Sequence, residues 1–139
     1  MTRILVVDDN KLIRHLICEL LLEDPQFEVV GQAADGLAAI RQAAALQPDL
    51  VTMDVQMPHL NGFDAAEGIH LVSPRSSVVF VSGDCTEECT ERAYECGASA
   101  FVPKHRLGDQ LLPAIRLVDA DLNRPVVTQG TASDFDARY

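Results

Sequence analysis

Polar side chains that can do chemistry stand at the ends of four separate apolar runs. Asp8 and Asp9 follow the first run, Asp54 ends a run near the middle of the chain, and Ser82 and Lys104 follow the last two. In a parallel sheet the carboxyl ends of the strands open on one edge, which is where such sheets bind ligands. Asp54 alone is more simply a turn residue. Its partners at the other strand ends favour a shared site.

Carboxylates this close repel one another, and a hard cation with oxygen ligands relieves the repulsion. Mg²⁺ fits best, because proteins commonly hold it with one or two carboxylates, water and substrate phosphate. An aspartate can also act as a nucleophile and form an aspartyl phosphate, while a metal ion and a lysine neutralise the phosphoryl oxygens. The five side chains match that reaction.

The apolar runs alternate with segments of helical periodicity. Short runs rich in β-branched residues predict five strands, at residues 3–9, 27–33, 49–54, 77–84 and 98–104. Apolar residues three and four positions apart predict a helix after each strand, the last at 107–122. In the second helix the expected apolar positions are Leu37, Ile40, Ala44 and Leu46. This alternation predicts an α/β fold, with a parallel sheet covered by helices on both faces.

Length and charge limit the classes of protein to which the chain can belong. A chain of 139 residues is one ordinary domain, expected at 1–123, and the Gly-, Ser-, Thr- and Pro-bearing segment 124–139 is interpreted as an extension or linker stub. No apolar run approaches the roughly 18 residues that cross a bilayer, and no leader is visible, so we expect a soluble, cytoplasmic protein without membrane insertion. Eleven basic against twenty-one acidic residues argue against direct binding to nucleic acid.

The four cysteines, Cys18, Cys85, Cys89 and Cys96, show neither a CxxC pair nor zinc-finger spacing. They resemble reduced cytosolic thiols. Cys85, Cys89 and Cys96 fall near one stripe of a helix, where small apolar packing is favoured over a redox or metal role.

The motifs at the strand ends occur in a characteristic order. They are the acid pair Asp8-Asp9, the turn Asp54-x-x-Met57-Pro58-x-x-x-Gly62, Ser82-Gly83, Gly97-Ala98-x-x-Phe101 and Lys104. Each is weak alone, but the ordered set is specific. From Arg3 to about Leu122 the chain closely resembles the receiver domains of two-component response regulators, the family that includes the chemotaxis receiver. The resemblance implies a flavodoxin-like, doubly wound sheet with strand order 2-1-3-4-5.

The resemblance also implies a role for each residue of the site. Asp54 would be the phosphoacceptor, and Lys104 would contact the phosphoryl oxygens. Asp9, Asp54 and the backbone carbonyl of Gln56 would bind Mg²⁺, and Asp8 would act mainly through a metal-bound water. Ser82 and Phe101 would form a switch pair.

The implied partners follow from the same family. The phosphoryl donor would be a phosphohistidine of a sensor histidine kinase or phosphotransfer protein. The face made by the fourth helix, fifth strand and fifth helix would then change shape for a downstream protein, for the chain's own output domain, or for a second copy in a homodimer. Such a domain is a phosphoacceptor with Mg²⁺-dependent self-phosphorylation and autodephosphorylation, and not a turnover enzyme.

The chain departs from the family pattern at two positions. The family usually has a proline after the lysine, often in a cis peptide, whereas here Pro103 precedes Lys104 and His105 follows it. The family more often has threonine where Ser82 stands.

The alternative within the family is the receiver half of a longer DNA-binding transcription regulator, since the segment up to Leu107 looks closer to receivers that precede helix-turn-helix domains. A flavin carrier and an aspartyl-phosphate phosphatase are disfavoured, the latter because Gln56 stands where it needs an acid.

Overall fold

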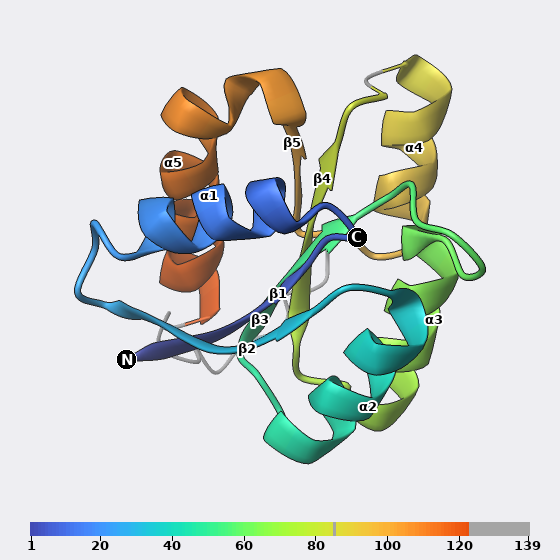
Figure 1. Cartoon of the computed structure of the whole chain (residues 1–139), viewed down its shortest axis with the longest axis horizontal. Coiled ribbons are helices and arrows are strands. Elements are labelled where there is room, and N and C mark those ends of the chain that lie inside the picture. The colour runs from blue at the N-terminus through green and yellow to red at the C-terminus, as the bar shows by residue number, and fades with distance from the viewer. Residues whose placement is uncertain (85, 123–139) are drawn as a thin grey trace, which may run out of the picture.

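A computed structural model describes residues 1–84 and 86–122 of the chain. Within these residues, strands and helices alternate from the first strand to the last helix (Figure 1). The strands are β1 (Thr2–Val7), β2 (Phe27–Ala33), β3 (Leu50–Asp54), β4 (Ser77–Ser82) and β5 (Ala100–Pro103). The helices are α1 (Lys11–Leu21), α2 (Gly36–Leu46), α3 (Gly62–Val72), α4 (Glu87–Glu95) and α5 (Leu107–Leu122), with a 3-10 turn at Lys104–Arg106. The expected extension at 124–139 and Cys85 lie outside the described residues.

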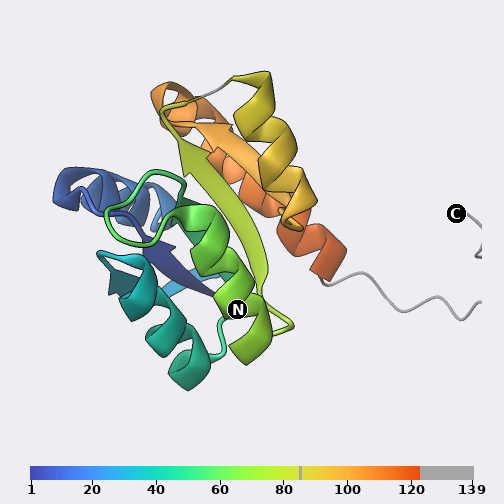
Figure 2. The same ribbon diagram turned by 90° about the vertical axis from the view of Figure 1, so that its right-hand side faces the viewer.

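The five strands form one sheet in the order β2-β1-β3-β4-β5, and every neighbouring pair is parallel. Both the α/β class and the strand order are therefore confirmed. Helices α1 and α5 cover one face of the sheet, and α2, α3 and α4 cover the other (Figure 2). In this arrangement the carboxyl ends of all five strands open on one edge.

Side-chain caps mark the start of four of the helices. Asn10, Asp35, Asn61 and Thr86 each accept a hydrogen bond from a backbone N–H in the first turn of α1, α2, α3 and α4, respectively. These N–H groups have no partner within the helix, so the caps fix where each helix begins. Apart from the longer loop between β3 and α3, the connections from strand to helix are short, and the polar residues at the strand ends stay on the edge of the sheet.

The sheet is apolar on both faces, and the two helical layers bury different kinds of residue against it. The layer of α1 and α5 buries large aliphatic side chains, namely Ile17, Leu21, Leu107, Leu111, Ile115 and Val118. The layer of α2, α3 and α4 buries five alanines together with Phe63 and Ile69. No helix of the described residues is long and apolar enough to cross a membrane.

The apolar face expected for the second helix is partly wrong. Leu37 is 57% exposed and Ala44 is exposed, whereas Ala39 and Ala43 are fully buried. Helix α2 packs beside α3, where Ile40 lies so close to Gly68 that a Cβ there would stand 2.5 Å from Ile40 Cδ1. Small residues allow this close approach, and they rather than the leucines face the core.

The loop after β5 differs from the family pattern in the order of proline and lysine. Pro103 is the last residue of β5, and Lys104, His105 and Arg106 form the 3-10 turn that leads into α5. The described residues contain no cis peptide bond. The unusual order of proline and lysine therefore leaves Lys104 at the carboxyl end of β5, as the sequence predicts.

Candidate functional site

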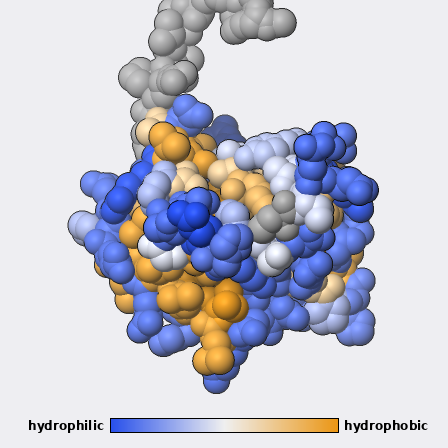
Figure 3. All heavy atoms as spheres, turned by 90° about the horizontal axis from the view of Figure 1, so that it is seen from above, coloured by the Kyte–Doolittle hydropathy of each residue, from blue (hydrophilic) through white to orange (hydrophobic). Residues whose placement is uncertain are grey.

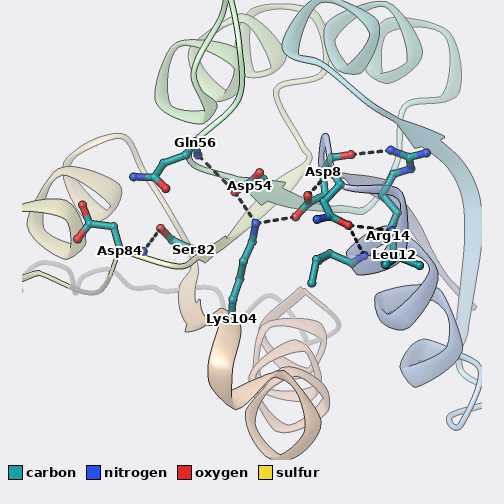
Figure 4. A network of polar contacts seen from close by, with 10 residues as sticks. Asp8, Leu12, Arg14, Asp54, Gln56, Ser82, Asp84 and Lys104 are labelled. Atoms are coloured by element: carbon teal, nitrogen blue, oxygen red, sulfur yellow. Dashed lines mark hydrogen bonds and ion pairs between the residues drawn. The ribbon is translucent and has the colours of Figure 1, made fainter.

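The polar residues expected at the strand ends meet at one edge of the sheet (Figure 4). Asp8 follows β1, Asp54 ends β3 and Lys104 follows β5. One carboxylate oxygen from each of Asp8, Asp9 and Asp54 lies within 4.8 Å of the other two. Among the described residues this is the single group of three or more acids, histidines or cysteines close enough to hold a metal ion.

Lys104 bridges the two buried acids of this group. Its Nζ lies 3.2 Å from Asp8 Oδ2 and 3.2 Å from Asp54 Oδ1. The side chains of Asp8 and Asp54 are 0% and 1% exposed, whereas that of Lys104 is 25% exposed. Burial disfavours the charged form of Lys104, but the Asp54 and Asp8 carboxylates outweigh it and raise its pKa. The ammonium therefore stays charged and partly neutralises the acids.

The charge of Asp54 is only partly compensated within the site. Burial and the neighbouring Asp8 carboxylate raise the pKa of Asp54 to about 7, although Lys104 opposes the shift. Asp54 Oδ2 is buried and has no hydrogen-bond partner among the described residues. A buried carboxylate oxygen without a donor is costly unless a cation or a proton meets it. The donor set of three carboxylates suits Mg²⁺, so the residues present fit that ion.

The loop after β3 holds Asp54 through its backbone. Gln56 N–H donates to Asp54 Oδ1 over 3.3 Å, and Gly62 N–H donates to the Val55 carbonyl over 2.8 Å. A Cβ on Gly62 would lie 2.2 Å from the Asp54 carbonyl oxygen, so a residue without a side chain is required there. This close approach explains the glycine at the end of the turn motif, and it brings the Gln56 backbone beside the acids.

The loop after β1 holds Asp8. Asn10 N–H donates to Asp8 Oδ1 over 2.8 Å, while Asn10 Oδ1 caps α1 through Leu12 and Ile13. The Arg14 guanidinium donates to the Asp8 carbonyl over 2.8 Å. Arg14 carries no signal in the sequence, because no local pattern shows that a residue in the second turn of α1 reaches back to the strand end.

Ser82 and Phe101 occupy different places relative to this centre. Ser82 is buried at the end of β4, and its Oγ accepts a hydrogen bond from Asp84 N–H over 3.0 Å. Phe101 is half-buried in β5 and packs against the α2–α4 layer. It is in register with Phe80 of β4, whereas Ser82 is in register with Pro103. Phe101 therefore lies on the edge strand, two residues further from the carboxyl ends of the strands than Ser82 does.

A groove of about 870 Å³ opens beside the site, between the β3–α3 loop and the start of α4. Met57 and Phe63 form part of its lining, and Gln56, Asp84 and Arg92 add polar groups. Figure 3 looks onto the sheet edge at which the strands end, where hydrophobic patches lie among hydrophilic residues.

The described cysteines are placed as packing residues. Cys89 and Cys96 are half-buried against the α2–α4 layer, and Cys18 packs against the layer of α1 and α5. Burial raises the pKa of the Cys96 thiol, and the Glu67 carboxylate adds to the shift. This environment agrees with the expectation of small, apolar packing for Cys89 and Cys96.

Comparison with known proteins gives the family. The family model described as the response regulator receiver domain matches residues 4–116. The chain belongs to the response regulator receiver family. It is accordingly a receiver domain of two-component systems, a class that fits a phosphoacceptor.

Curated relatives of this receiver domain include longer proteins. It is 43% identical over 105 residues to a protein-glutamate methylesterase/protein-glutamine glutaminase of Nocardioides sp., covering 73% of this chain and 28% of the relative. A protein of the same name from Pyrococcus abyssi is 41% identical over 104 residues, with the same two coverages. The chain thus spans about 28% of the length of these relatives.

Solved receiver structures share the fold over almost the whole domain. The response regulator domain of Thermotoga maritima CheB has a TM-score of 0.79 and 32% identity, covering 90% of this chain and 98% of that one. A LuxR-family two-component response regulator from Aurantimonas sp. SI85-9A1 has a TM-score of 0.83 and 29% identity, with coverages of 87% and 86%. One of these neighbours is a domain of CheB, and the other belongs to the LuxR family of response regulators.

Proposed function

We propose that Asp54 of this receiver domain accepts a phosphoryl group from the phosphohistidine of a histidine kinase or phosphotransfer protein. One observation carries the proposal: Asp54 is a buried carboxylate at the end of the central strand, with one oxygen bound to Lys104 and the other without a hydrogen-bond donor. In the transfer, an Asp54 oxygen attacks phosphorus, the phosphorus–nitrogen bond breaks, and its electron pair stays on the imidazole nitrogen.

The metal ligands in this proposal are Asp9, Asp54 and the Gln56 carbonyl, with Asp8 acting mainly through a metal-bound water. Bound Mg²⁺ would neutralise charge on the phosphoryl oxygens. Asp9 is exposed whereas Asp8 and Asp54 are buried, so the site is open on the side of Asp9 and closed beneath. An entering phosphoryl group would come from that open side.

Lys104 would exchange partners during the reaction. It now contacts Asp8 and Asp54, and its three donors can also reach an oxygen of a phosphoryl group on Asp54. Its charge stabilises the negative charge that the transfer brings into the site. The domain would undergo self-phosphorylation and autodephosphorylation in this way, without turnover of a separate substrate.

The acceptor assignment is tested with acetyl phosphate and Mg²⁺. We expect intact-mass spectrometry to show an adduct of about 80 daltons, the mass of one phosphoryl group replacing a proton. The Asp54→Asn variant should lose it, and chelation of Mg²⁺ should suppress it. Asp49→Asn is the matched control, because Asp49 lies at the opposite end of β3 and is exposed. An undiminished adduct on Asp54→Asn would refute the assignment.

Ser82 and Phe101 would report the phosphoryl group to the face made by α4, β5 and α5. A phosphoryl group would draw the Ser82 hydroxyl away from Asp84 N–H, and the Phe101 ring would turn toward the space that is left. That face would serve a downstream protein, an output domain or a homodimer. With beryllium fluoride as phosphate mimic, amide shifts in α4 and α5 should be smaller in Ser82→Ala and Phe101→Ala than in the parent. Equal responses in all three proteins would exclude this coupling.

The output that this receiver controls has two candidates. The methylesterase relatives support an output domain of that enzyme class, and the LuxR-family neighbour supports a DNA-binding one. The cytoplasmic location proposed for the domain suits both. Sequencing the gene beyond the codon for Tyr139, together with its neighbours, distinguishes them: an adjoining helix-turn-helix region would exclude the methylesterase reading.

A further inference from the structure

Asp8 is held at each of its polar groups. Its N–H donates to the Ala33 carbonyl of β2 over 3.1 Å, and Oδ1 accepts from Asn10 N–H. Oδ2 is paired with Lys104, and the remaining group, the carbonyl oxygen, accepts from Arg14 Nη1 (Figure 4). The first three contacts come from Ala33 of β2, from Asn10 in the loop after β1 and from Lys104. The fourth comes from the second turn of α1.

The Asp8 carbonyl belongs to the peptide unit that joins Asp8 to Asp9. A peptide unit is planar, so fixing its oxygen also fixes the direction in which the chain enters Asp9. Asp9 is exposed, and its carboxylate must stay within 4.8 Å of the other two acids for the three to share an ion. Arg14 is therefore placed to orient Asp9 without lying among the ligands.

Arg14 closes the loop from two sides. Its backbone N–H donates to the Asn10 carbonyl over 3.0 Å as part of α1, while its side chain returns to the strand end. Both ends of the loop between β1 and α1 are thus tied to one residue. A loop constrained in this way loses less conformational entropy when it binds an ion.

We propose that Arg14 is a positioning residue of the metal site: its hydrogen bond to the Asp8 carbonyl holds the Asp8–Asp9 peptide in the orientation that brings Asp9 to the ion. This rests on the proposed Mg²⁺ site. The electrostatic effect of Arg14 has the opposite sign, because a cation beside three acids repels Mg²⁺. The direction of the change on removing Arg14 therefore separates positioning from charge.

The test measures Mg²⁺ binding by calorimetry for the parent and Arg14→Met. We expect Mg²⁺ affinity to fall about tenfold although a positive charge is removed, as is usual for residues that orient metal ligands from outside the coordination shell. Arg116→Met is the matched control, since it removes a guanidinium that pairs with Asp24 away from the acids. Unchanged or tighter binding by Arg14→Met, or equal losses in both variants, would overturn the proposal.

A second measurement works without metal. Amide hydrogen exchange of Asn10, Leu12 and Ile13, whose N–H groups donate to Asp8 and to the Asn10 cap, should be at least fivefold faster in metal-free Arg14→Met than in Arg116→Met. If the parent itself fails to bind Mg²⁺, the metal part of the proposed function fails and this exchange alone decides the positioning role. Unchanged exchange would reject it. Arg14→Gln, two atoms shorter and neutral, is judged by the same criteria if Arg14→Met does not fold.

Discussion

The two helical layers on the sheet stabilise it with side chains of different size. Helix α5 runs for 16 residues and buries four aliphatic residues against the sheet, whereas α4 runs for 9 residues and buries Ala93 alone. Half-buried Cys89 and Cys96 add to the contact of α4, and Arg92 lies over the Phe63 ring with Cζ 4.8 Å from its centroid. Burial stabilises in proportion to apolar area, so α5 is attached more strongly than α4.

This difference matters because both helices flank β5, which leads to Lys104. A weakly attached helix opens locally at a smaller free-energy cost than a strongly attached one. Helix α4 also forms one wall of the groove beside Asp54. We therefore expect a change at the acids to move α4 more than α5, and the comparison of the two helices can be tested by removing their contacts one at a time.

The largest effect is expected from Leu111→Ala. Leu111 is fully buried between α5 and the sheet, and truncating such a residue costs roughly 2–5 kcal/mol of unfolding free energy. Leu117→Ala on the same helix is the control, because Leu117 is 74% exposed and should change stability by less than about 0.5 kcal/mol. Urea unfolding measures both. Equal losses would mean that α5 is not anchored by its buried face.

An intermediate effect is expected from Asp54→Asn in the absence of Mg²⁺. The pKa of Asp54 is about 7 in the folded chain, above its ordinary value of 3.8, so the folded state binds the extra proton. The free energy of unfolding should therefore fall as pH rises from about 4 to 7, and the Asn variant should be more stable than the parent above pH 7, by on the order of 2 kcal/mol.

Thr52→Val provides the control for this pH dependence. Thr52 lies on the same strand and its buried hydroxyl has no hydrogen-bond partner among the described residues, so its removal should stabilise by about 1 kcal/mol at every pH. Thermal unfolding from pH 4 to 9 in a chelator checks both variants. A parent whose stability does not fall between pH 4 and 7 would contradict the raised pKa.

The smallest effect is expected from Arg92→Met. It removes the cation from the Phe63 ring and should cost about 0.5–1 kcal/mol at most. Amide exchange in α4 should accelerate while that in α5 stays unchanged, because the contact joins α4 to α3 alone. Arg41→Met, on the exposed side of α2, is the control and should leave exchange in α4 as it is. Acceleration in both helices would remove the contrast between them.

Local patterns in the sequence were sufficient to predict the elements and the main site. Alternating strands and helices predict the sheet, and the polar residues at the strand ends predict the gathering of Asp8, Asp9, Asp54 and Lys104 that the structure shows. Both predictions succeed because strand ends in a parallel sheet meet wherever the strands themselves form. Gly62 was predicted only as a turn residue, and the structure adds that its approach to the Asp54 carbonyl leaves no room for a side chain.

Tertiary structure alone decided which residues of a helix face the core and which side chains support the site. Leu37 and Ala44 of α2 fit an amphipathic pattern, but both are exposed in the structure, and Ala39 and Ala43 are buried instead. Arg14 reaches the Asp8 carbonyl only because α1 folds back over the end of β1. Contacts of this kind depend on how elements pack, which the period of a single helix does not encode.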